Sequence, residues 1–197
     1  MKIILGLGNP GVKYARTRHN IGRLLIQYCL DKFESKTSKR NDLEVHGVSV
    51  RWKEEEIFWG YPTTYMNLSG IAVRKITTYY NINVSKDLLI VVDDIALPFG
   101  KLRFRVSGSD GGHNGLKSVT NTLQTRCFSR LRIGIGNEIS RGDLNIPLEE
   151  FVLDTFTSFE KEELTEVLER GYNAVQDWLV HPPDKAMNII NTDHQRG

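Results

Sequence analysis

The sequence predicts an α/β fold: a single domain over residues 1–190, in which a mixed, mostly parallel twisted sheet packs between helices. Short apolar runs alternate with segments of helical periodicity, which is typical of a sheet covered by helices. One segment reads as a hairpin and another strand alternates apolar residues with arginine, so part of the sheet should be antiparallel. A length of 197 residues, 40% of them hydrophobic, suits one compact core.

The first predicted elements are a buried strand and a helix. Residues 3–8 form an apolar run that ends in Gly-Asn-Pro-Gly, the composition of a turn. Thr17 can then cap a helix, because apolar residues recur at helical spacing over residues 21–33. Residues 36–42 are polar and read as a loop.

A hairpin and a second helix follow. Apolar and polar residues alternate over 48–52, and a charged turn at 53–56 leads into the apolar run 57–60, so two paired strands are expected. Helical periodicity returns over residues 67–82.

The next segment combines a buried strand, a basic strand and a glycine-rich loop. Residues 88–92 are continuously apolar, which suits a strand buried on both faces, and the acidic pair Asp93-Asp94 follows. Residues 102–106 alternate apolar side chains with arginine, so this strand should expose one basic face. Residues 107–115 form the glycine-rich loop that feeds a helix over 116–123.

The last predicted elements are a strand over residues 128–135, which carries Arg130 and Arg132 at alternate positions, and a helix over residues 158–179. Thr157 and Glu160 have the spacing of a capping box at the start of that helix. Residues 191–197 are expected to be a flexible tail.

Composition and charge exclude several classes of protein. Lys and Arg number 26 against 24 Asp and Glu, so the net charge of +2 excludes a polybasic binder. The two cysteines, Cys29 and Cys127, are far apart, which favours two buried free thiols over a disulfide or a structural zinc site. No apolar stretch approaches the length of a membrane span, so a soluble cytoplasmic protein without membrane contact is expected.

The sequence Gly6-Leu7-Gly8-Asn9-Pro10-Gly11 has the letters of the dinucleotide fingerprint, which raises NAD binding as one hypothesis. The context argues against it, because Pro10 removes a backbone donor and the following helix begins late. The acidic residue expected to bind the ribose would be Asp31, which lies inside the predicted helix.

A hydrolytic site is the second hypothesis. Loops that leave the carboxyl ends of parallel strands converge on one crevice, so Asn9, His19 and Asp93 can meet there. A carboxylate that accepts a proton from one imidazole nitrogen leaves the other nitrogen free to act as a base toward water. The alternative is that Asp93 is an ordinary turn or cap residue beside Asp94.

Two asparagines and a basic region also have two interpretations. Asn67 and Asn114 could cap helices, or their amides could bind a peptide main chain as donor and acceptor. Residues 101–132 hold seven basic side chains against Asp110 alone, which indicates either a phosphate-binding face or a solvated strand face.

Several motifs, in family order over most of the chain, resemble bacterial-type peptidyl-tRNA hydrolase. They are Gly6–Gly11 with Tyr14 and Thr17-Arg18-His19-Asn20-Ile21-Gly22, then Thr64-Tyr65-Met66-Asn67-Leu68-Ser69-Gly70, Asp93-Asp94 with Leu97-Pro98 and Gly100, and Gly111-Gly112-His113-Asn114-Gly115-Leu116-Lys117. The resemblance implies a cytosolic, usually monomeric esterase that cleaves the bond between peptide and tRNA in prematurely released peptidyl-tRNA. It implies neither a metal nor an organic cofactor.

The resemblance also implies roles for individual residues. His19 would be the base that activates water, Asp93 would orient it, and Asn9 would help to position the histidine and the tRNA end. Asn67 and Asn114 would hold the peptide main chain beside the ester and help to stabilise the oxyanion. The remaining residues implied to bind substrate are Tyr14 and Met66 near the tRNA terminus, and Arg103, Arg105 and Arg132 against the acceptor stem and its 5′ phosphate.

The chain departs from the family pattern at three places. The family often has His before the motif aspartate and Glu after it, where this chain has Val92 and Asp94. Residues 137–148 also differ from the short connection that the family leads us to expect. Because chloroplast relatives act as RNA-splicing partners, a non-catalytic RNA-interaction protein of the same fold is the alternative function.

Overall fold

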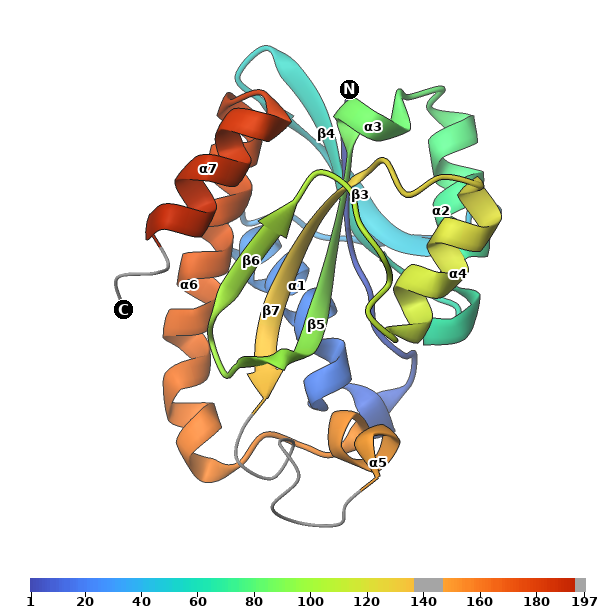
Figure 1. Ribbon diagram of the computed structural model, residues 1–197. Coiled ribbons are helices and arrows are strands. Elements are labelled where there is room, and N and C mark those ends of the chain that lie inside the picture. Colours follow the sequence, from blue (N-terminus) through green and yellow to red (C-terminus); the bar gives the residue numbers. More distant parts are fainter. Residues whose placement is uncertain (137–146, 194–197) are drawn as a thin grey trace.

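The computed structural model describes residues 1–136 and 147–193, in which one seven-stranded sheet has the order β2-β3-β4-β1-β5-β7-β6 (Figure 1). Strands β4, β1, β5 and β7 are parallel, whereas β2, β3 and β6 run antiparallel to their neighbours. The strands are β1 (Lys2–Gly6), β2 (Ser38–Arg40), β3 (Val45–Trp52), β4 (Glu55–Pro62), β5 (Leu88–Pro98), β6 (Leu102–Arg105) and β7 (Ser129–Gly136). The predicted mixed, mostly parallel sheet is confirmed.

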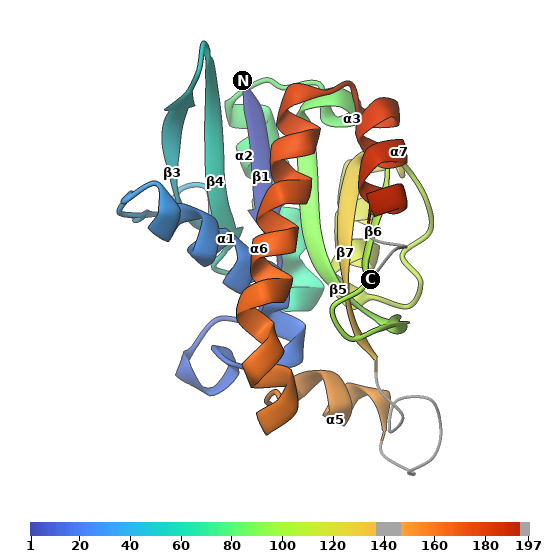
Figure 2. The ribbon, with the colours of Figure 1, turned by 90° about the vertical axis from the view of Figure 1, so that its left-hand side faces the viewer.

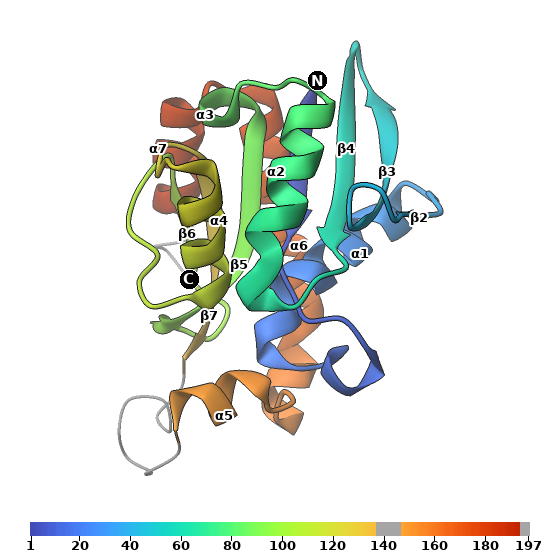
Figure 3. The ribbon, with the colours of Figure 1, turned by 90° about the vertical axis from the view of Figure 1, so that its right-hand side faces the viewer.

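Helices cover both faces of the sheet. Figure 2 shows α1, α6 and α7 in front of one face, and Figure 3 shows α2 and α4 in front of the other. The main helices are α1 (Ile21–Lys32), α2 (Ser69–Tyr79), α3 (Val84–Asp87), α4 (Asn114–Leu123), α5 (Leu148–Leu153), α6 (Ser158–Val180) and α7 (Pro183–Asp193). Short 3-10 turns are η1 (Val12–Tyr14), η2 (Arg18–Asn20) and η3 (Met66–Leu68).

The central strands are apolar on both sides because each side faces a separate core. In β1, Ile4 packs into the core beneath α1 and α6, while Ile3 and Leu5 pack into the core beneath α2 and α4. All three side chains are fully buried. Because both faces of β1 are buried, the apolar run at residues 3–8 shows no alternation of apolar and polar residues.

Several predicted boundaries need correction. The polar segment 36–42 contains the short strand β2, which pairs with β3 at the sheet edge. The first α-helix begins at Ile21, after η2, and the Thr17 hydroxyl donates to the carbonyl of Tyr14 at 2.9 Å and does not cap the helix. Helix α2 is shorter than the predicted 67–82.

The predicted tail also begins too early. Helix α7 continues through Asp193, and the Asn191 side chain bonds both the N–H and the carbonyl of Phe104 on β6, at 2.9 and 3.1 Å. Residues 194–197 and most of the departing segment 137–148 lie outside the described residues. Sequence reasoning did not predict α3, α5 or α7.

The prediction for Cys29 is confirmed and that for Cys127 is wrong, while the predicted capping box is present. Cys29 is buried as expected, whereas Cys127 is exposed, because it lies in the connection before β7 and not in the sheet. At the start of α6, Thr157 Oγ1 accepts from the N–H of Glu160 and the Glu160 carboxylate accepts from the N–H of Thr157, which confirms the capping box. Among the described residues, no helix combines the length and the apolar character needed to cross a membrane.

Helix α1 lies against the sheet at a glycine. A Cβ on Gly22 would collide with the carbonyl oxygen of Val91 on β5 and would lie 3.0 Å from that of Leu7. Both oxygens belong to backbone that is itself bonded, since the N–H of Leu7 donates to the Val91 carbonyl at 2.9 Å. The absence of a side chain therefore sets how closely α1 approaches β1 and β5.

Replacing Gly22 with Ala should lower the free energy of unfolding by about 1–3 kcal/mol, because overpacked backbone cannot move aside. Urea unfolding of the purified variant measures this loss. Gly171→Ala in α6 is the matched control, because its new methyl would meet only the flexible side chain of Leu25, at 2.9 Å. If both variants lose the same free energy of unfolding, the close backbone contact at Gly22 is not the cause of the loss.

Candidate active site

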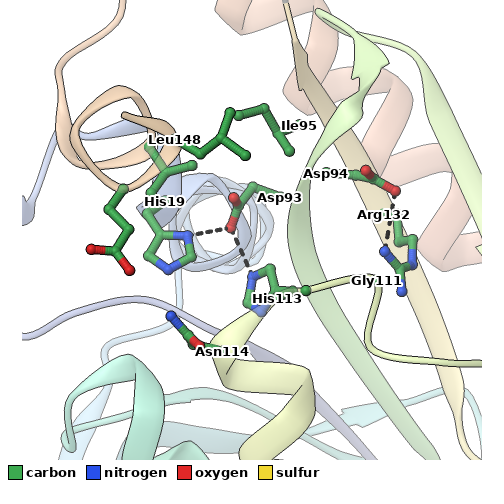
Figure 4. A pocket seen from close by; sticks show the side chains of 12 residues that line it. His19, Asp93, Asp94, Ile95, Gly111, His113, Asn114, Arg132 and Leu148 are labelled. Atoms are coloured by element: carbon green, nitrogen blue, oxygen red, sulfur yellow. Dashed lines mark hydrogen bonds and ion pairs between the residues drawn. The ribbon is translucent and has the colours of Figure 1, made fainter. Parts of the chain in front are cut away.

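The predicted site residues meet at the carboxyl ends of β1 and β5. Asn9 follows β1, His19 lies in η2, Asp93 lies in β5 and Asn114 begins α4. Figure 4 shows His19, Asp93, His113 and Asn114 around one pocket. Contrary to the prediction, Asp93 does not follow the strand. It lies inside β5, paired with Ile133, and the strand runs on to Pro98 through a register shift.

The carboxylate of Asp93 is the centre of the site. Its Oδ1 lies 2.8 Å from Nδ1 of His19 and 2.9 Å from Nε2 of His113, and the residue is 3% exposed. Burial by itself would raise the pKa of Asp93, but the charges of His19 and His113 and their hydrogen bonds outweigh burial and hold this pKa well below its usual range. Asp93 is therefore an ionised acceptor.

His113 is a site residue that the sequence interpretation missed. Its Nδ1 accepts from the backbone N–H groups of Gly115 at 3.0 Å and Leu116 at 3.2 Å, so the imidazole is the N-cap of α4. An Nδ1 that accepts leaves the proton on Nε2, which donates to Asp93. His113 stood in the glycine-rich motif, three residues before the predicted start of the helix at 116, and histidine is not among the residues favoured at an N-cap.

His19 has the opposite arrangement. Because Asp93 is ionised and can only accept, Nδ1 of His19 carries the proton, and in the neutral imidazole Nε2 keeps its lone pair. Burial alone would lower the pKa of His19, yet the charge of Asp93 and its hydrogen bond more than offset burial and raise this pKa above its usual value. The ring is 8% exposed and lines the cavities described below, so Nε2 can act as a base toward a bound water.

Asn9 is held by the backbone of Met66 and by the side chain of Asn20. Its Oδ1 accepts from the N–H of Met66 at 2.9 Å, and Asn20 bonds both the N–H and the carbonyl of Asn9, at 2.8 and 3.0 Å. These bonds tie the loop after β1 to η2 and η3, which carry His19 and Asn67. Through Asn20, the neighbour of His19, these bonds give Asn9 an indirect link to His19.

Two adjoining cavities contain most of the expected residues. One of 310 Å³ reaches from His19 and Asp93 to His113 and Arg132, and one of 260 Å³ holds Asn9, Met66 and Asn67. The lining of both cavities includes His19, Asn114, Glu149 and Val152. Tyr14 is not among the residues that line them; it lies in η1, where Lys13 stacks on its ring.

A buried ion pair fixes the turn that carries His19. Arg18 is 2% exposed and donates through Nη2 and Nε to the Glu160 carboxylate, at 2.8 and 3.3 Å. Its Nη1 donates to the Phe151 carbonyl at 3.3 Å and its guanidinium stacks on that ring. Since Glu160 also closes the capping box of α6, one side chain joins η2, α5 and α6.

A separate basic groove of 310 Å³ lies between β6, β7 and the glycine-rich loop. Its lining includes Arg103, Arg105, Arg130 and Arg132. Arg103 and Arg105 are exposed on alternate positions of β6, as predicted. The Asp94 carboxylate pairs with Arg132 at 3.2 Å, so the residue that departs from the family pattern partly neutralises this groove.

Arg130 does not lie on an exposed face of its strand, contrary to the prediction for this basic region. Its side chain is fully buried, and it donates to the carbonyls of Gly108 and Arg126, both at 2.7 Å. Burial lowers the pKa of Arg130 to about 10, and the neighbouring charge of Arg132 adds to this effect. Together Arg130 and Arg132 hold the loop at Ser109 by its carbonyl oxygens.

The geometry of the site favours proton transfer over metal binding or dinucleotide binding. The ligand atoms of His19, Asp93 and His113 lie within 4.8 Å of one another, close enough to hold a metal ion. In this arrangement Nε2 of His113 and Nδ1 of His19 each donate a proton to Asp93, so a metal ion would have to displace both protons to bind these atoms.

The dinucleotide hypothesis also fails on geometry. A Cβ on Gly6 would strike the Gly22 carbonyl, so Gly6 serves the contact with α1. The residues after Gly11 form a 3-10 turn and not the helix whose N-terminus would bind a pyrophosphate.

Comparisons with known proteins agree with one another. The model of the family described as peptidyl-tRNA hydrolase matches residues 3–196. The chain is 41% identical to the peptidyl-tRNA hydrolase of Shouchella clausii and 43% identical to that of Desulfitobacterium hafniense, covering 97% of this chain and 100% of each relative. The crystal structure of peptidyl-tRNA hydrolase from Acinetobacter baumannii superposes with a TM-score of 0.85 at 30% identity, covering 97% of this chain and 94% of that one.

We expect the imidazole of His19 to titrate above its usual pKa, and Asp93→Asn to bring this pKa below the usual value, because burial then acts without the carboxylate. NMR titration of the imidazole resonances measures both values. His46 is the internal control, since burial and the charges of Arg23 and Lys39 lower its pKa independently of Asp93. An unchanged His19 pKa in the variant would show that Asp93 does not set its protonation.

Proposed function

Because the chain belongs to the peptidyl-tRNA hydrolase family and hydrolyses the ester bond between peptide and tRNA, we propose that His19, Asp93 and His113 form its proton-transfer centre. The observation that carries this proposal is the single oxygen of Asp93 shared by two imidazoles of opposite tautomer. The relatives are named as hydrolases, and nothing in the comparisons supports the non-catalytic splicing partner.

The reaction begins with a water held against Nε2 of His19. As the water attacks the peptidyl carbonyl, its proton passes to Nε2, and the imidazolium that forms is stabilised by the ionised Asp93. His113 donates to the same carboxylate and keeps it from rotating away from His19. When the intermediate collapses, the proton on Nε2 passes to the ribose oxygen that leaves.

The amides of Asn9, Asn67 and Asn114 are placed to bind the peptide side of the ester. All three line the cavity beside His19, and Asn67 and Asn114 are exposed there. Since the Oδ1 of Asn9 accepts from Met66, its NH₂ group is the part left to donate to substrate. Such donors stabilise the negative charge that develops on the carbonyl oxygen. Met66 contributes one apolar wall, and Tyr14 would meet the tRNA end only from outside these cavities.

The basic groove is the proposed site for the tRNA acceptor stem and its 5′ phosphate. Arg103, Arg105 and Arg132 line it, and Arg132 also lines the cavity that holds His19, so the groove lies next to the ester site. As the resemblance to the family implies, we expect a monomer that works in the cytoplasm and needs neither a metal nor an organic cofactor.

Replacing His19 with Ala should lower kcat by about 10²–10⁴ if His19 is the base. The measurement is release of peptide from an N-blocked aminoacyl-tRNA, with and without a chelator. Wild-type turnover should resist the chelator. A folded His19→Ala variant that keeps wild-type kcat would remove His19 from this role, and loss of wild-type turnover with chelator would point to a metal.

Arg105→Ala should weaken tRNA binding and flatten its salt dependence by about 0.9 in the log–log slope, the value of one phosphate contact on a duplex. Binding of uncharged tRNA over a range of salt concentrations measures this slope. Arg51→Ala is the control, because Arg51 is exposed on β3, toward the opposite edge of the sheet. The groove assignment fails if both variants keep the wild-type slope.

A further inference from the structure

The cavity beside His19 carries a carboxylate that has no role in the proposed reaction and no partner among the described residues. Of the residues that the structure describes, three acidic side chains line this cavity: Asp93, Asp94 and Glu149. Asp93 is bonded to two histidines and Asp94 is paired with Arg132 at 3.2 Å. Within residues 1–136 and 147–193, no cation pairs with Glu149, so its charge is the one that a substrate can meet directly.

Glu149 lies where the two cavities join. It lines the one that holds Asp93 and Arg132 as well as the one that holds Asn9 and Asn67. His19 and Asn114 are also common to both, so Glu149 borders the same space as the base and the peptide-binding amides. Under the proposed function, the amino acid esterified to tRNA binds in this space.

The helix that carries Glu149 is fixed relative to His19. Two residues further along α5, the Phe151 carbonyl and ring contact the guanidinium of Arg18, the neighbour of His19. The N–H of Arg18 also donates to the carbonyl of Asp154 just after α5, at 3.0 Å. The backbone that carries Glu149 therefore needs little ordering when substrate binds, while its exposed side chain lines the cavity.

The arginines of the basic groove lie away from α5, and Arg132, which also lines the cavity beside His19, is paired with Asp94. Arg103 and Arg105 line the basic groove, and none of the residues that line it comes from α5. In the view of Figure 4, Leu148 at the start of α5 and Arg132 lie on opposite sides of Asp93. The phosphates of tRNA therefore have a cationic groove away from α5, which leaves Glu149 to face the peptide.

We propose that Glu149 is a specificity-determining residue of this enzyme. It favours substrates in which the amino acid esterified to tRNA has a cationic side chain, such as lysine or arginine, and disfavours those with aspartate or glutamate. This inference rests on the proposed function, because it takes the cavity beside His19 to be where the ester binds. Two charges about 6–8 Å apart in a partly solvated cavity change affinity by about 3- to 10-fold.

The test compares substrates that differ only in the esterified residue. One tRNA is acylated chemically with N-acetyl-lysine, N-acetyl-glutamine or N-acetyl-glutamate, and kcat/KM is measured for each at low salt. We expect the wild type to prefer the lysine substrate over the glutamate substrate. Glu149→Gln should reduce the ratio of the two values about 3- to 10-fold, and Glu149→Lys should reverse the preference.

Glu150→Gln is the matched control. Glu150 is the exposed neighbour on α5 but lines neither cavity, so its removal should leave the ratio unchanged. High salt should lower the wild-type ratio toward that of Glu149→Gln.

Two results would overturn the inference. In the first, Glu149→Gln and Glu149→Lys keep the wild-type ratio while they hydrolyse the neutral glutamine substrate normally. In the second, Glu149→Gln loses turnover of all three substrates alike, which would give Glu149 a role in catalysis and not in selection. A wild type that hydrolyses none of the three would instead refute the proposed function.

Discussion

One buried oxygen organises the chemistry of this molecule. Oδ1 of Asp93 accepts hydrogen bonds from His19 and His113, and an acceptor shared in this way must stay ionised although the residue is almost wholly buried. Burying a lone carboxylate is costly, so the two imidazole N–H groups stabilise the charge that makes His19 a base. The tautomer of His113 is in turn decided by two backbone N–H groups at the start of α4. The protonation of the site therefore follows from the position of a helix end.

The remaining contacts hold three loops against this centre. Arg18 and Glu160 form a buried pair that joins η2 to α5 and α6, and Asn20 joins the same turn to Asn9. Breaking a buried pair from one side leaves an uncompensated charge, which is strongly unfavourable, so these loops are held as one unit. The same links fix α5, and with it Glu149, beside His19.

Charge is distributed unevenly around the cavity, although the whole chain is almost neutral. Arginines on β6 and β7 line one side, and Arg130 and Arg132 also hold the glycine-rich loop by its carbonyl oxygens. The carboxylate of Glu149 lines the other side. The electric field between a positive and a negative side of the cavity orients a substrate whose two parts differ in charge.

Local patterns in the sequence determined every strand except β2, the helices α1, α2, α4 and α6, and the capping box at Thr157, because apolar periodicity and capping depend on neighbouring residues. The motifs also pointed to Asn9, His19, Asp93, Asn67 and Asn114, all of which reach one pair of cavities. Tertiary structure alone decided that His113 shares Asp93, that Arg130 is buried, and that α5 brings Glu149 beside the base. These features depend on contacts between residues far apart in the chain, 20 positions for His113 and Asp93 and 142 for Arg18 and Glu160. No local pattern encodes such a distance, because it exists only after the sheet has brought its strand ends together.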